Sequence, residues 1–280
     1  MDFMDNILII GYGVVGKNLE KELKPLSPDI IDKYKSEENK ISQSAMENGY
    51  DLAFICVNTP FTEENPCDCS EVINAIIENK DKLKDDGVFV IKSTILPGTT
   101  ERIVKETQQN VIFSPEYYGG TQHNNNFEFD FTFLGGEKKN CIKAIQILQK
   151  VYDGRHRFSM TDSRTAERAK YKENSWLATK VSFCSQFFEI AEKEGVNYEE
   201  LRELFVLDPR VNPSHTFIYR DHPYWESHCL DKDVPAIAIT EDAKLLKTVI
   251  EFNMKKKEEF KKDWNVVIKH FLLILIISVL

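Results

Sequence analysis

Short apolar runs alternate with longer amphipathic stretches over the first 160 residues of the chain. Runs of this length, rich in Ile, Val and Phe, are typical of buried parallel strands. They predict strands at 6–10, 29–32, 52–57, 88–92 and 111–114, and later strands at 131–134 and 157–160. Helices are predicted between them at 17–23, 70–83, 99–107 and 138–151. This alternation predicts an α/β fold with an open parallel sheet of the Rossmann type.

The pattern changes after residue 160. Thr161 or Asp162 can cap a helix that runs to about Lys193, where Gly195 ends it. A helix of that length with a broad apolar face is expected to be the spine of an all-helical domain. The regions that follow are a helix at 198–206, an irregular loop at 207–231 and a helix at 232–262. We therefore predict a dinucleotide-binding domain at 1–160, a helical central domain at 161–262 and an apolar tail at 263–280.

The last ten residues, FLLILIISVL, are almost wholly apolar. A membrane-spanning helix needs about 20 such residues, so a membrane location is not favoured. A buried strand or helix end, or a contact between subunits, is the preferred interpretation. A tail that touches a membrane surface, next to Lys261 and Lys262, is the weaker alternative.

The composition narrows the class of protein. Of 280 residues, 42% are hydrophobic and 29% are charged, which is typical of a soluble globular protein. The net charge of −9 does not suggest a nucleic-acid partner. Six irregularly spaced cysteines favour a reducing cytoplasm over a disulfide framework. Cys67 and Cys69 lack the second pair that a tetrahedral zinc site needs, so no metal is expected. The polar run at 122–126 predicts a surface loop.

Three glycines follow the first predicted strand at once. Gly11, Gly13 and Gly16 form a G-x-G-x-x-G sequence between a strand and a helix, which is the context that a dinucleotide-binding loop requires. The first allows the tight turn, the second lets the backbone approach the pyrophosphate, and the third lets helix and strand pack closely. The alternative is a glycine turn in an α/β protein that binds no dinucleotide.

Asp32 lies 21 residues after Gly11, at the end of the second predicted strand. An acid there can accept the ribose hydroxyl groups, and it favours NAD over NADP because a 2′-phosphate would meet like charge. Lys33 and Lys35 lie beside it and weaken that preference.

Cys229 suggests a reaction beyond the simple oxidation of an alcohol. A simple alcohol dehydrogenase needs no thiol, whereas oxidation of an aldehyde to an acid can proceed through a cysteine adduct and a thioester. Lys170 and Asn174 lie four residues apart on the long helix, so they share one face and can stabilise an oxyanion. In isolation, Cys229 has the usual alternative of a buried small hydrophobe.

Several short segments occur in the order found in one family. They are Cys56–Pro60 (CVNTP), Lys92–Thr99 (KSTILPGT), Ser114–Glu116 (SPE), Ala166–Asn174 (AERAKYKEN), Asp208–Arg210 (DPR) and Cys229–Asp233 (CLDKD). Together they resemble the UDP-glucose/GDP-mannose dehydrogenase family of nucleotide-sugar 6-dehydrogenases. The resemblance implies oxidation of the 6-hydroxymethyl group of a nucleotide sugar, with UDP-glucose the favoured substrate, to a carboxylate by two NAD and one water.

The resemblance also implies residue roles. Cys229 would be the nucleophile and Glu116 the base for attack of water on the thioester, while Thr94 and Asp233 would hold a water. Arg210 would reach the sugar nucleotide of a neighbouring subunit, which implies a homodimer built on the long helix. The residues predicted to contact the cofactor are Gly11, Gly13, Val14, Val15, Gly16, Asp32, Lys33, Val57, Thr59 and Thr94. Those predicted to contact the substrate are Glu116, Lys170, Asn174 and Arg210.

Three features depart from the family pattern. Glu226 and Ser227 stand where two glycines are usual before the cysteine, which puts the identity of the sugar in doubt. The acid that commonly follows the Pro-Glu pair by four residues is missing, since Gly120 stands there. The family's C-terminal nucleotide-binding domain is also absent from these 280 residues.

Two other functions stay open. A single-step hydroxyacid-type dehydrogenase shares the glycine loop and the Lys-x-x-x-Asn pair but has no use for Cys229. A non-catalytic NAD-binding protein would bind the cofactor and turn over no nucleotide sugar.

Overall fold

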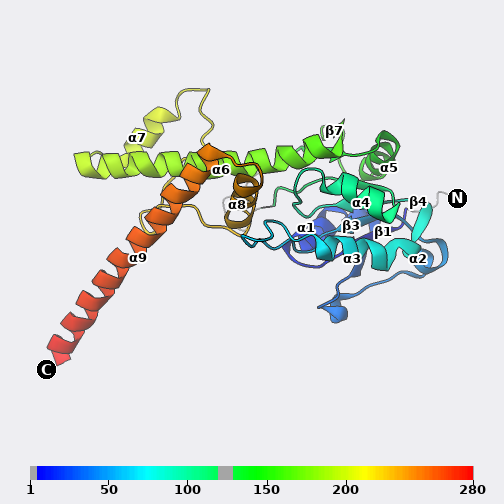
Figure 1. Cartoon of the computed structure of the whole chain (residues 1–280), viewed down its shortest axis with the longest axis horizontal. Helices are drawn as coiled ribbons and strands as arrows, with labels where there is room; N and C mark the ends of the chain where they lie inside the picture. The colour runs from blue at the N-terminus through cyan, green and yellow to red at the C-terminus, as the bar shows by residue number, and fades with distance from the viewer. Residues whose placement is uncertain (1–4, 119–128, 280) are drawn as a thin grey trace. The chain divides into compact units, whose positions relative to one another are not determined.

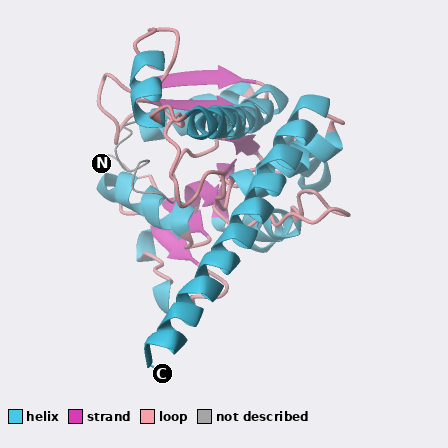
Figure 2. Ribbon diagram, turned by 90° about the vertical axis from the view of Figure 1, so that its left-hand side faces the viewer, coloured by secondary structure: helices cyan, strands magenta, loops and turns pink. Residues whose placement is uncertain are grey.

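The computed structural model describes residues 5–118 and 129–279, with side chains up to residue 262. The predicted loop at 122–126 and the first four residues lie outside the described residues. The chain forms two compact units, Met1–Tyr171 and Lys172–Leu280. The strands seen in Figure 2 all belong to the first unit, whereas the regular elements described in the second unit are helices.

A seven-stranded sheet forms the centre of the first unit, in the order β2-β1-β3-β4-β5-β6-β7. The strands are β1 (Ile7–Ile10), β2 (Asp29–Ile31), β3 (Tyr50–Ile55), β4 (Leu83–Ile91), β5 (Val111–Phe113), β6 (Phe131–Gly135) and β7 (Arg157–Thr161). The predicted Rossmann-type fold is confirmed, but the expectation of a parallel sheet throughout is wrong at one pair. β5 and β6 are antiparallel, paired through Phe113 and Gly135. An antiparallel neighbour needs no crossover helix, and the sequence between these strands predicts none.

Helices cover both faces of this sheet (Figure 1). They are α1 (Val14–Glu22), α2 (Gln43–Asn48), α3 (Ser70–Asn79), α4 (Thr99–Thr107) and α5 (Lys138–Leu148). Because side chains alternate along a strand, Phe89 and Ile91 of β4 join the core beneath α3 and α4, whereas Val88 and Val90 join the core beneath α1 and α5. The short α2 was not predicted; Ser42 caps it by accepting a hydrogen bond from the amide of Ala45 at 3.3 Å.

The second unit is built on α6 (Ser163–Glu194), a helix of 32 residues that begins in the first unit. It also contains α7 (Tyr198–Phe205), α8 (Leu230–Thr240) and α9 (Lys244–Val279). The prediction of one helix at 232–262 is wrong. The helix is interrupted between α8 and α9 at Asp242. The φ of this residue, 48°, is in the left-handed region and cannot continue a right-handed helix.

The predicted apolar tail is the last part of α9, whose backbone is helical to Val279. Its side chains from residue 263 lie outside the description. Among the described residues, no helix combines the length and the hydropathy that crossing a membrane requires.

Glu167, in the second turn of α6, anchors this helix to the start of α4. It is fully buried, and its carboxylate accepts hydrogen bonds from the amide of Thr100 at 2.8 Å, the hydroxyl of Thr100 at 2.6 Å and the amide of Gly98. Burial raises the pKa of Glu167, although the hydrogen bonds from Thr100 and Gly98 oppose the shift. The carboxylate therefore serves as the cap that α4 lacks from its own N-cap residue, Gly98.

We predict that Glu167→Ala lowers the free energy of unfolding by about 3 kcal/mol, because it leaves the buried amide and hydroxyl of Thr100 and the partly buried amide of Gly98 without their acceptor. Glu101→Ala is the matched control. Glu101 pairs with Arg164 at 2.6 Å, but both side chains are about half exposed, so its loss is expected to be below about 1 kcal/mol. Urea denaturation of both variants measures the difference, and equal losses would contradict the anchoring role of Glu167.

Candidate active site

The carboxyl ends of five neighbouring strands, β1 to β5, meet at one edge of the sheet, since β1, β2, β3, β4 and β5 pair in parallel. The residues predicted from the sequence in the first unit follow these ends. Gly11–Gly16 follow β1, Asp32 follows β2, Val57 and Thr59 follow β3, Thr94 follows β4, and Glu116 follows β5. The order of strands reverses at β1, between β2 and β3, and such a switch point is where open α/β sheets bind ligands.

The glycine loop has the geometry of a pyrophosphate cradle. Gly11 has a φ of 92°, and a Cβ there would lie 2.8 Å from the carbonyl oxygen of Cys56. A Cβ at Gly16 would lie 2.1 Å from the carbonyl oxygen of Gly11, whereas a Cβ at Gly13 would meet nothing within 4 Å. Gly11 and Gly16 are thus required by packing, and Gly13 keeps the outer side of the loop open. No side chain caps α1, so its first amides can face an anion.

Asp32 is tied to this loop. Its carboxylate accepts hydrogen bonds from the amides of Tyr12 at 2.6 Å, Tyr34 at 2.8 Å and Lys35 at 2.9 Å. Burial tends to raise the pKa of Asp32, but these hydrogen bonds and the Lys35 ammonium together lower it. Asp32 is therefore held as an anion, with its two oxygens aimed at the loop and its flank. A carboxylate offers about four acceptor positions, so one remains for a ribose hydroxyl.

The two lysines beside Asp32 have other partners. The Lys35 ammonium donates to the carbonyl oxygen of Tyr12 at 3.1 Å. The Lys33 ammonium lies 3.9 Å from the carboxylate of Glu71 and 5.8 Å from the ring centroid of Tyr34. The Lys35 side chain thus helps to fix the glycine loop, whereas the Lys33 ammonium lies near Glu71 of α3.

Thr59 and Thr94 are brought together. The buried Thr59 hydroxyl donates to the carbonyl oxygen of Thr94 at 2.8 Å. The Cys67 thiol lies 3.6 Å from the same oxygen and 3.6 Å from the sulfur of Cys69. The Ser93 hydroxyl fixes the other side of the segment by donating to the carbonyl oxygen of Val57 at 2.6 Å. The loops after β3 and β4 are therefore joined through side-chain hydroxyls.

Glu116 and Lys170 lie at the same end of the first unit. The Glu116 carboxylate accepts a hydrogen bond from the amide of Tyr118. The ammonium of Lys170, which is 5% exposed, lies 4.5 Å from the ring centroid of Tyr117, within the range of a cation–π interaction. Tyr117 in turn packs at 5.2 Å from the ring of Phe131.

In the second unit, three predicted residues form one group. Asn174 of α6 donates from its amide to the Asp233 carboxylate at 2.7 Å, and both side chains are buried. Lys232 donates to the other oxygen of Asp233 at 2.5 Å. The amide of Asp233 donates to the carbonyl oxygen of Cys229 at 2.8 Å, because Cys229 is the N-cap residue of α8. Asp233 therefore links the cysteine to Asn174 through the first turn of α8.

Arg210 stands apart from that group. Its guanidinium holds the carboxylate of Asp208 in a bidentate pair, with the shortest contact at 2.6 Å, and its side chain is 88% exposed. The Arg210 guanidinium thus lies on the surface, where Asp208 two residues earlier balances its charge.

One partly buried charge was missed by the sequence reasoning. Lys92 lies at the end of β4 on the α1 side of the sheet, where its ammonium is 3.4 Å from the hydroxyl of the fully buried Ser114. Burial lowers the pKa of Lys92, and the negative groups Glu22 and Glu116 oppose that shift. The available signal was a lysine directly after the apolar run 88–91.

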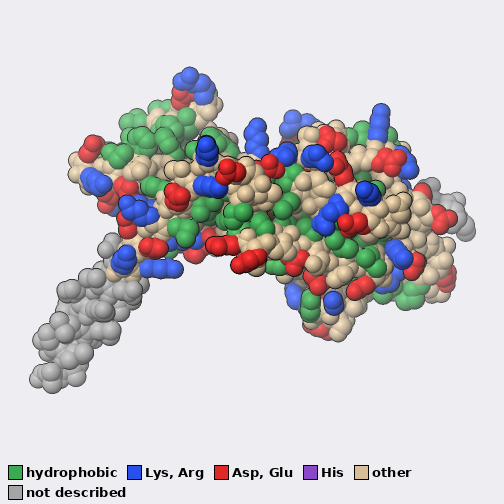
Figure 3. All heavy atoms as spheres, in the orientation of Figure 1, with side chains coloured by type: hydrophobic (Ala, Val, Ile, Leu, Met, Phe, Trp, Pro, Cys, Tyr) green, Lys and Arg blue, Asp and Glu red, His purple; other side chains and the backbone are tan. Residues whose placement is uncertain are grey.

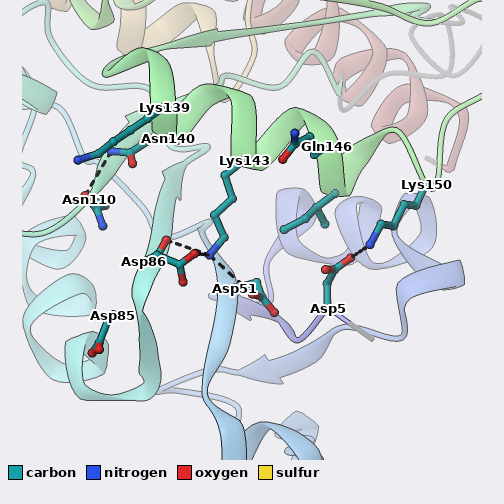
Figure 4. A pocket seen from close by; sticks show the side chains of 11 residues that line it. Asp5, Asp51, Asp85, Asp86, Asn110, Lys139, Asn140, Lys143, Gln146 and Lys150 are labelled. Atoms are coloured by element: carbon teal, nitrogen blue, oxygen red, sulfur yellow. Dashed lines mark hydrogen bonds and ion pairs between the residues drawn. The ribbon is translucent and has the colours of Figure 1, made fainter. Parts of the chain in front are cut away.

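A polar hollow of about 620 Å³ lies at the opposite, amino-terminal edge of the sheet (Figure 4). Lys143 of α5 points into it and pairs with Asp86 at 2.8 Å and with Asp51 at 3.7 Å, while Lys150 pairs with Asp5 at 2.6 Å. These charges neutralise one another, and they join α5 to the starts of the strands. We therefore assign the hollow a structural role.

The chain is similar to known proteins over both units. Residues 17–155 match the NAD binding domain of the UDP-glucose/GDP-mannose dehydrogenase family, and residues 164–255 match its central domain. The predicted NAD cofactor is confirmed by the first of these matches.

Individual relatives give the same result. The chain is 30% identical over 285 residues to UDP-N-acetyl-D-mannosamine dehydrogenase of Methanocaldococcus jannaschii, covering 92% of this chain and 65% of that protein. It is 28% identical over 259 residues to UDP-glucose 6-dehydrogenase of Rickettsia felis, covering 85% and 57%. A solved UDP-glucose dehydrogenase from Pyrobaculum islandicum shares its fold, with a TM-score of 0.74 at 22% identity over 90% of this chain and 68% of that one. The chain thus spans 57–65% of the length of these curated relatives.

The glycine loop yields a paired prediction. We expect Gly16→Ala to lower the free energy of unfolding by about 3 kcal/mol, because its Cβ would overlap a backbone oxygen. Gly13→Ala is expected to change stability by less than about 1 kcal/mol. It should raise the dissociation constant for NAD about tenfold or more, because its methyl group would stand where the pyrophosphate approaches. Thermal unfolding and calorimetric titration with NAD separate the two effects. Unchanged NAD affinity in Gly13→Ala would contradict the assigned cradle.

Proposed function

We propose that this chain, which belongs to the UDP-glucose/GDP-mannose dehydrogenase family, oxidises the primary alcohol of a UDP-linked sugar to a carboxylate. The observation that carries the proposal is the placement of Cys229. Five of the six cysteines are buried, and Cys229 is the partly exposed one, at the N-terminus of α8 beside the Asn174–Asp233 pair.

Each unit contributes a distinct part of the chemistry. NAD, when bound, would accept one hydride, and with it two electrons, in each of the two oxidations. The Cys229 thiolate adds to the aldehyde carbon, and the partial positive charge at the N-terminus of α8 favours the anion that forms there. After the second oxidation the sugar is held as a thioester. Glu116 takes a proton from water, which attacks the thioester carbon, releases the carboxylate and restores the thiol.

Lys170 and Asn174 supply the hydrogen-bond donors for the alkoxide and for the oxyanion of the adduct. Both lie in α6, one turn apart, and both are almost fully buried. Lys170 is oriented by the ring of Tyr117, and the Asn174 amide is oriented by Asp233. Thr94 and Asp233 are proposed to hold the water that Glu116 activates.

The sugar is proposed to be glucose or N-acetylmannosamine, the sugars in the names of the two relatives. The six free thiols suit a reducing cytoplasm, where we place the reaction.

We expect about two NADH for each UDP-sugar consumed, measured by absorbance with limiting UDP-glucose or UDP-N-acetylmannosamine. Cys229→Ser should block formation of the carboxylate while leaving NAD affinity unchanged. Cys184→Ser, at a buried thiol of the same unit, is the control and should keep the stoichiometry. One NADH for each sugar would favour the single-step hydroxyacid-type dehydrogenase. Cofactor binding without turnover of either sugar would favour a non-catalytic NAD-binding protein.

We also propose a homodimer through α6. Apolar side chains are exposed along this helix and over α7, where Figure 3 shows hydrophobic atoms gathered at the upper left. On α6, Trp176 is 60% and Phe183 is 52% exposed, and Leu204 of α7 is 69% exposed. A soluble monomer rarely exposes so many large apolar groups together, so a second copy is expected to cover them.

Phe183→Glu is therefore expected to convert a dimer to a monomer, because it places a charge in the apolar contact. Sedimentation velocity measures the mass. Ile77→Glu, at a residue of α3 that is 49% exposed in the first unit, is the control and should leave the mass unchanged. A wild-type monomer at micromolar concentration would contradict the proposed interface.

A further inference from the structure

The segment that leads to Cys229 is held by the side chain of Asn253, on α9. The amide of Trp225 donates to the Asn253 side-chain oxygen at 2.9 Å, and the Asn253 side-chain amide donates to the carbonyl oxygen of Trp225 at 2.9 Å. Asn253 is 2% exposed and Trp225 is 5% exposed. The Trp225 indole also donates to the hydroxyl of Ser182 on α6 at 3.0 Å. The buried Asn253 side chain thus satisfies both the backbone amide and the backbone carbonyl of Trp225.

Lys257 lies one turn further along α9, on the same face as Asn253. Its ammonium is 2.7 Å from the Asp231 carboxylate and 3.3 Å from the Glu226 carboxylate, and its side chain is 17% exposed. Burial alone would lower the pKa of Lys257, but the carboxylates of Asp231 and Glu226 raise it. Lys257 therefore stays charged between two acids that flank Cys229 in the sequence.

Ser227 and Asp231 close the turn around the cysteine. The Ser227 amide donates to the Asp231 carboxylate at 2.6 Å, and the Ser227 hydroxyl accepts a hydrogen bond from the amide of Leu230 at 3.0 Å. This reciprocal pattern is similar to a helix capping box, but it begins two residues before the N-cap residue Cys229 and its acid lies four residues after the serine instead of three. Lys257 acts on the same carboxylate that receives the Ser227 amide, so α9 and the turn are connected through Asp231.

We infer that Asn253 and Lys257 are positioning residues for Cys229: they fix the turn 225–231 on α9 and so set where the thiol stands. The inference rests on the proposed role of Cys229 as the nucleophile. In this chain Glu226 and Ser227 replace the glycine pair usual before the cysteine, and their side chains are used in these contacts. Lys257 also neutralises two carboxylates that would otherwise disfavour an anion at Cys229.

A nucleophile must be placed accurately relative to the carbon that it attacks, so small shifts of the Cys229 thiol are expected to have large effects on the rate. A displacement of a reacting group by about 1 Å can lower the rate of the chemical step about a hundredfold. Contacts that hold the turn at both ends can therefore affect the reaction strongly even where they contribute little to the free energy of unfolding. Asn253 holds the turn four residues before the cysteine, and Lys257 holds it through Asp231 two residues after. Neither residue needs to touch the substrate to act in this way.

Site-resolved alkylation of the full chain tests the inference without any turnover. Iodoacetamide is added to the wild type, Asn253→Leu and Lys257→Met, and mass spectrometry of the peptides gives a rate for each cysteine. We expect Cys229 to react about fivefold faster in both variants, because the turn opens locally. In Lys257→Met the gain in access is expected to outweigh the opposing effect of the Glu226 and Asp231 carboxylates, which that variant leaves unpaired near the thiol. Cys184, which is 4% exposed in the same unit, should keep its slow wild-type rate.

Two further variants sharpen the result. Lys257→Arg keeps the charge and should restore the wild-type rate at Cys229. Lys247→Met removes another lysine of α9, whose ion pair with Asp242 is exposed, and should change nothing. If Asn253→Leu does not fold, Lys257→Met and Lys257→Arg still decide, since Lys257 lies at the edge of the turn.

The inference is overturned if the Cys229 rate stays within twofold of the wild type in the variants, or if Cys184 accelerates together with Cys229. The second result would mean that the contacts support the helical unit as a whole. Turnover with UDP-sugar is a separate readout, in which kcat should fall more than KM changes. A wild type without turnover would count against the proposed function and leave the alkylation result interpretable.

Discussion

The parallel register of the sheet is the constraint on which the candidate site depends. At its carboxyl edge, the first residues after a strand still form backbone hydrogen bonds with the neighbouring strand. The amide of Cys56 donates to the carbonyl oxygen of Ile10 at 2.7 Å, that of Lys92 to Ile55 at 2.9 Å, and that of Ser114 to Ile91 at 2.9 Å. A slip of one residue would exchange the two faces of a strand and send every loop side chain to the wrong side. The hydrogen bonds that pair the strands therefore also place the loops that carry the residues proposed for cofactor binding and catalysis.

The glycine loop and the cysteine turn reach a fixed shape by opposite means. The glycine loop is compact because side chains are absent: Gly11 and Gly16 pack backbone against backbone with no room for a Cβ. The cysteine turn is compact because side chains are present, with Asn253 satisfying the backbone and Lys257 joining two carboxylates. A cofactor pyrophosphate needs bare amides, whereas a nucleophile needs a rigid support. The two solutions suit the two tasks.

The sequence predicted the parts that depend on local patterns. Strands and helices of the first unit followed from runs of apolar residues, and the glycine loop followed from three residues. The features that were missed depend on partners distant in sequence. Glu167 caps a helix 67 residues earlier, and the groups around Lys92, such as Phe54 and Ser114, are distant from it in sequence. The break at Asp242 was also missed, because an aspartate in a charged helical stretch gives no local stop signal. The spacing of four on one helix paired Lys170 with Asn174, and thiol chemistry singled out Cys229, but only the resemblance connected the pair with the cysteine, since no local spacing relates them.

The environment of each cysteine explains why only Cys229 is assigned chemistry. A thiol reacts as its thiolate, and an apolar interior disfavours that charge. Burial raises the pKa of Cys56 to about 12 and that of Cys141 to about 11, so these two thiols stay neutral near pH 7. Cys229 differs in its exposure and in standing at the start of α8, where the helix favours negative charge. The six cysteines have the same intrinsic chemistry, and the fold leaves Cys229 partly exposed while it buries the other five.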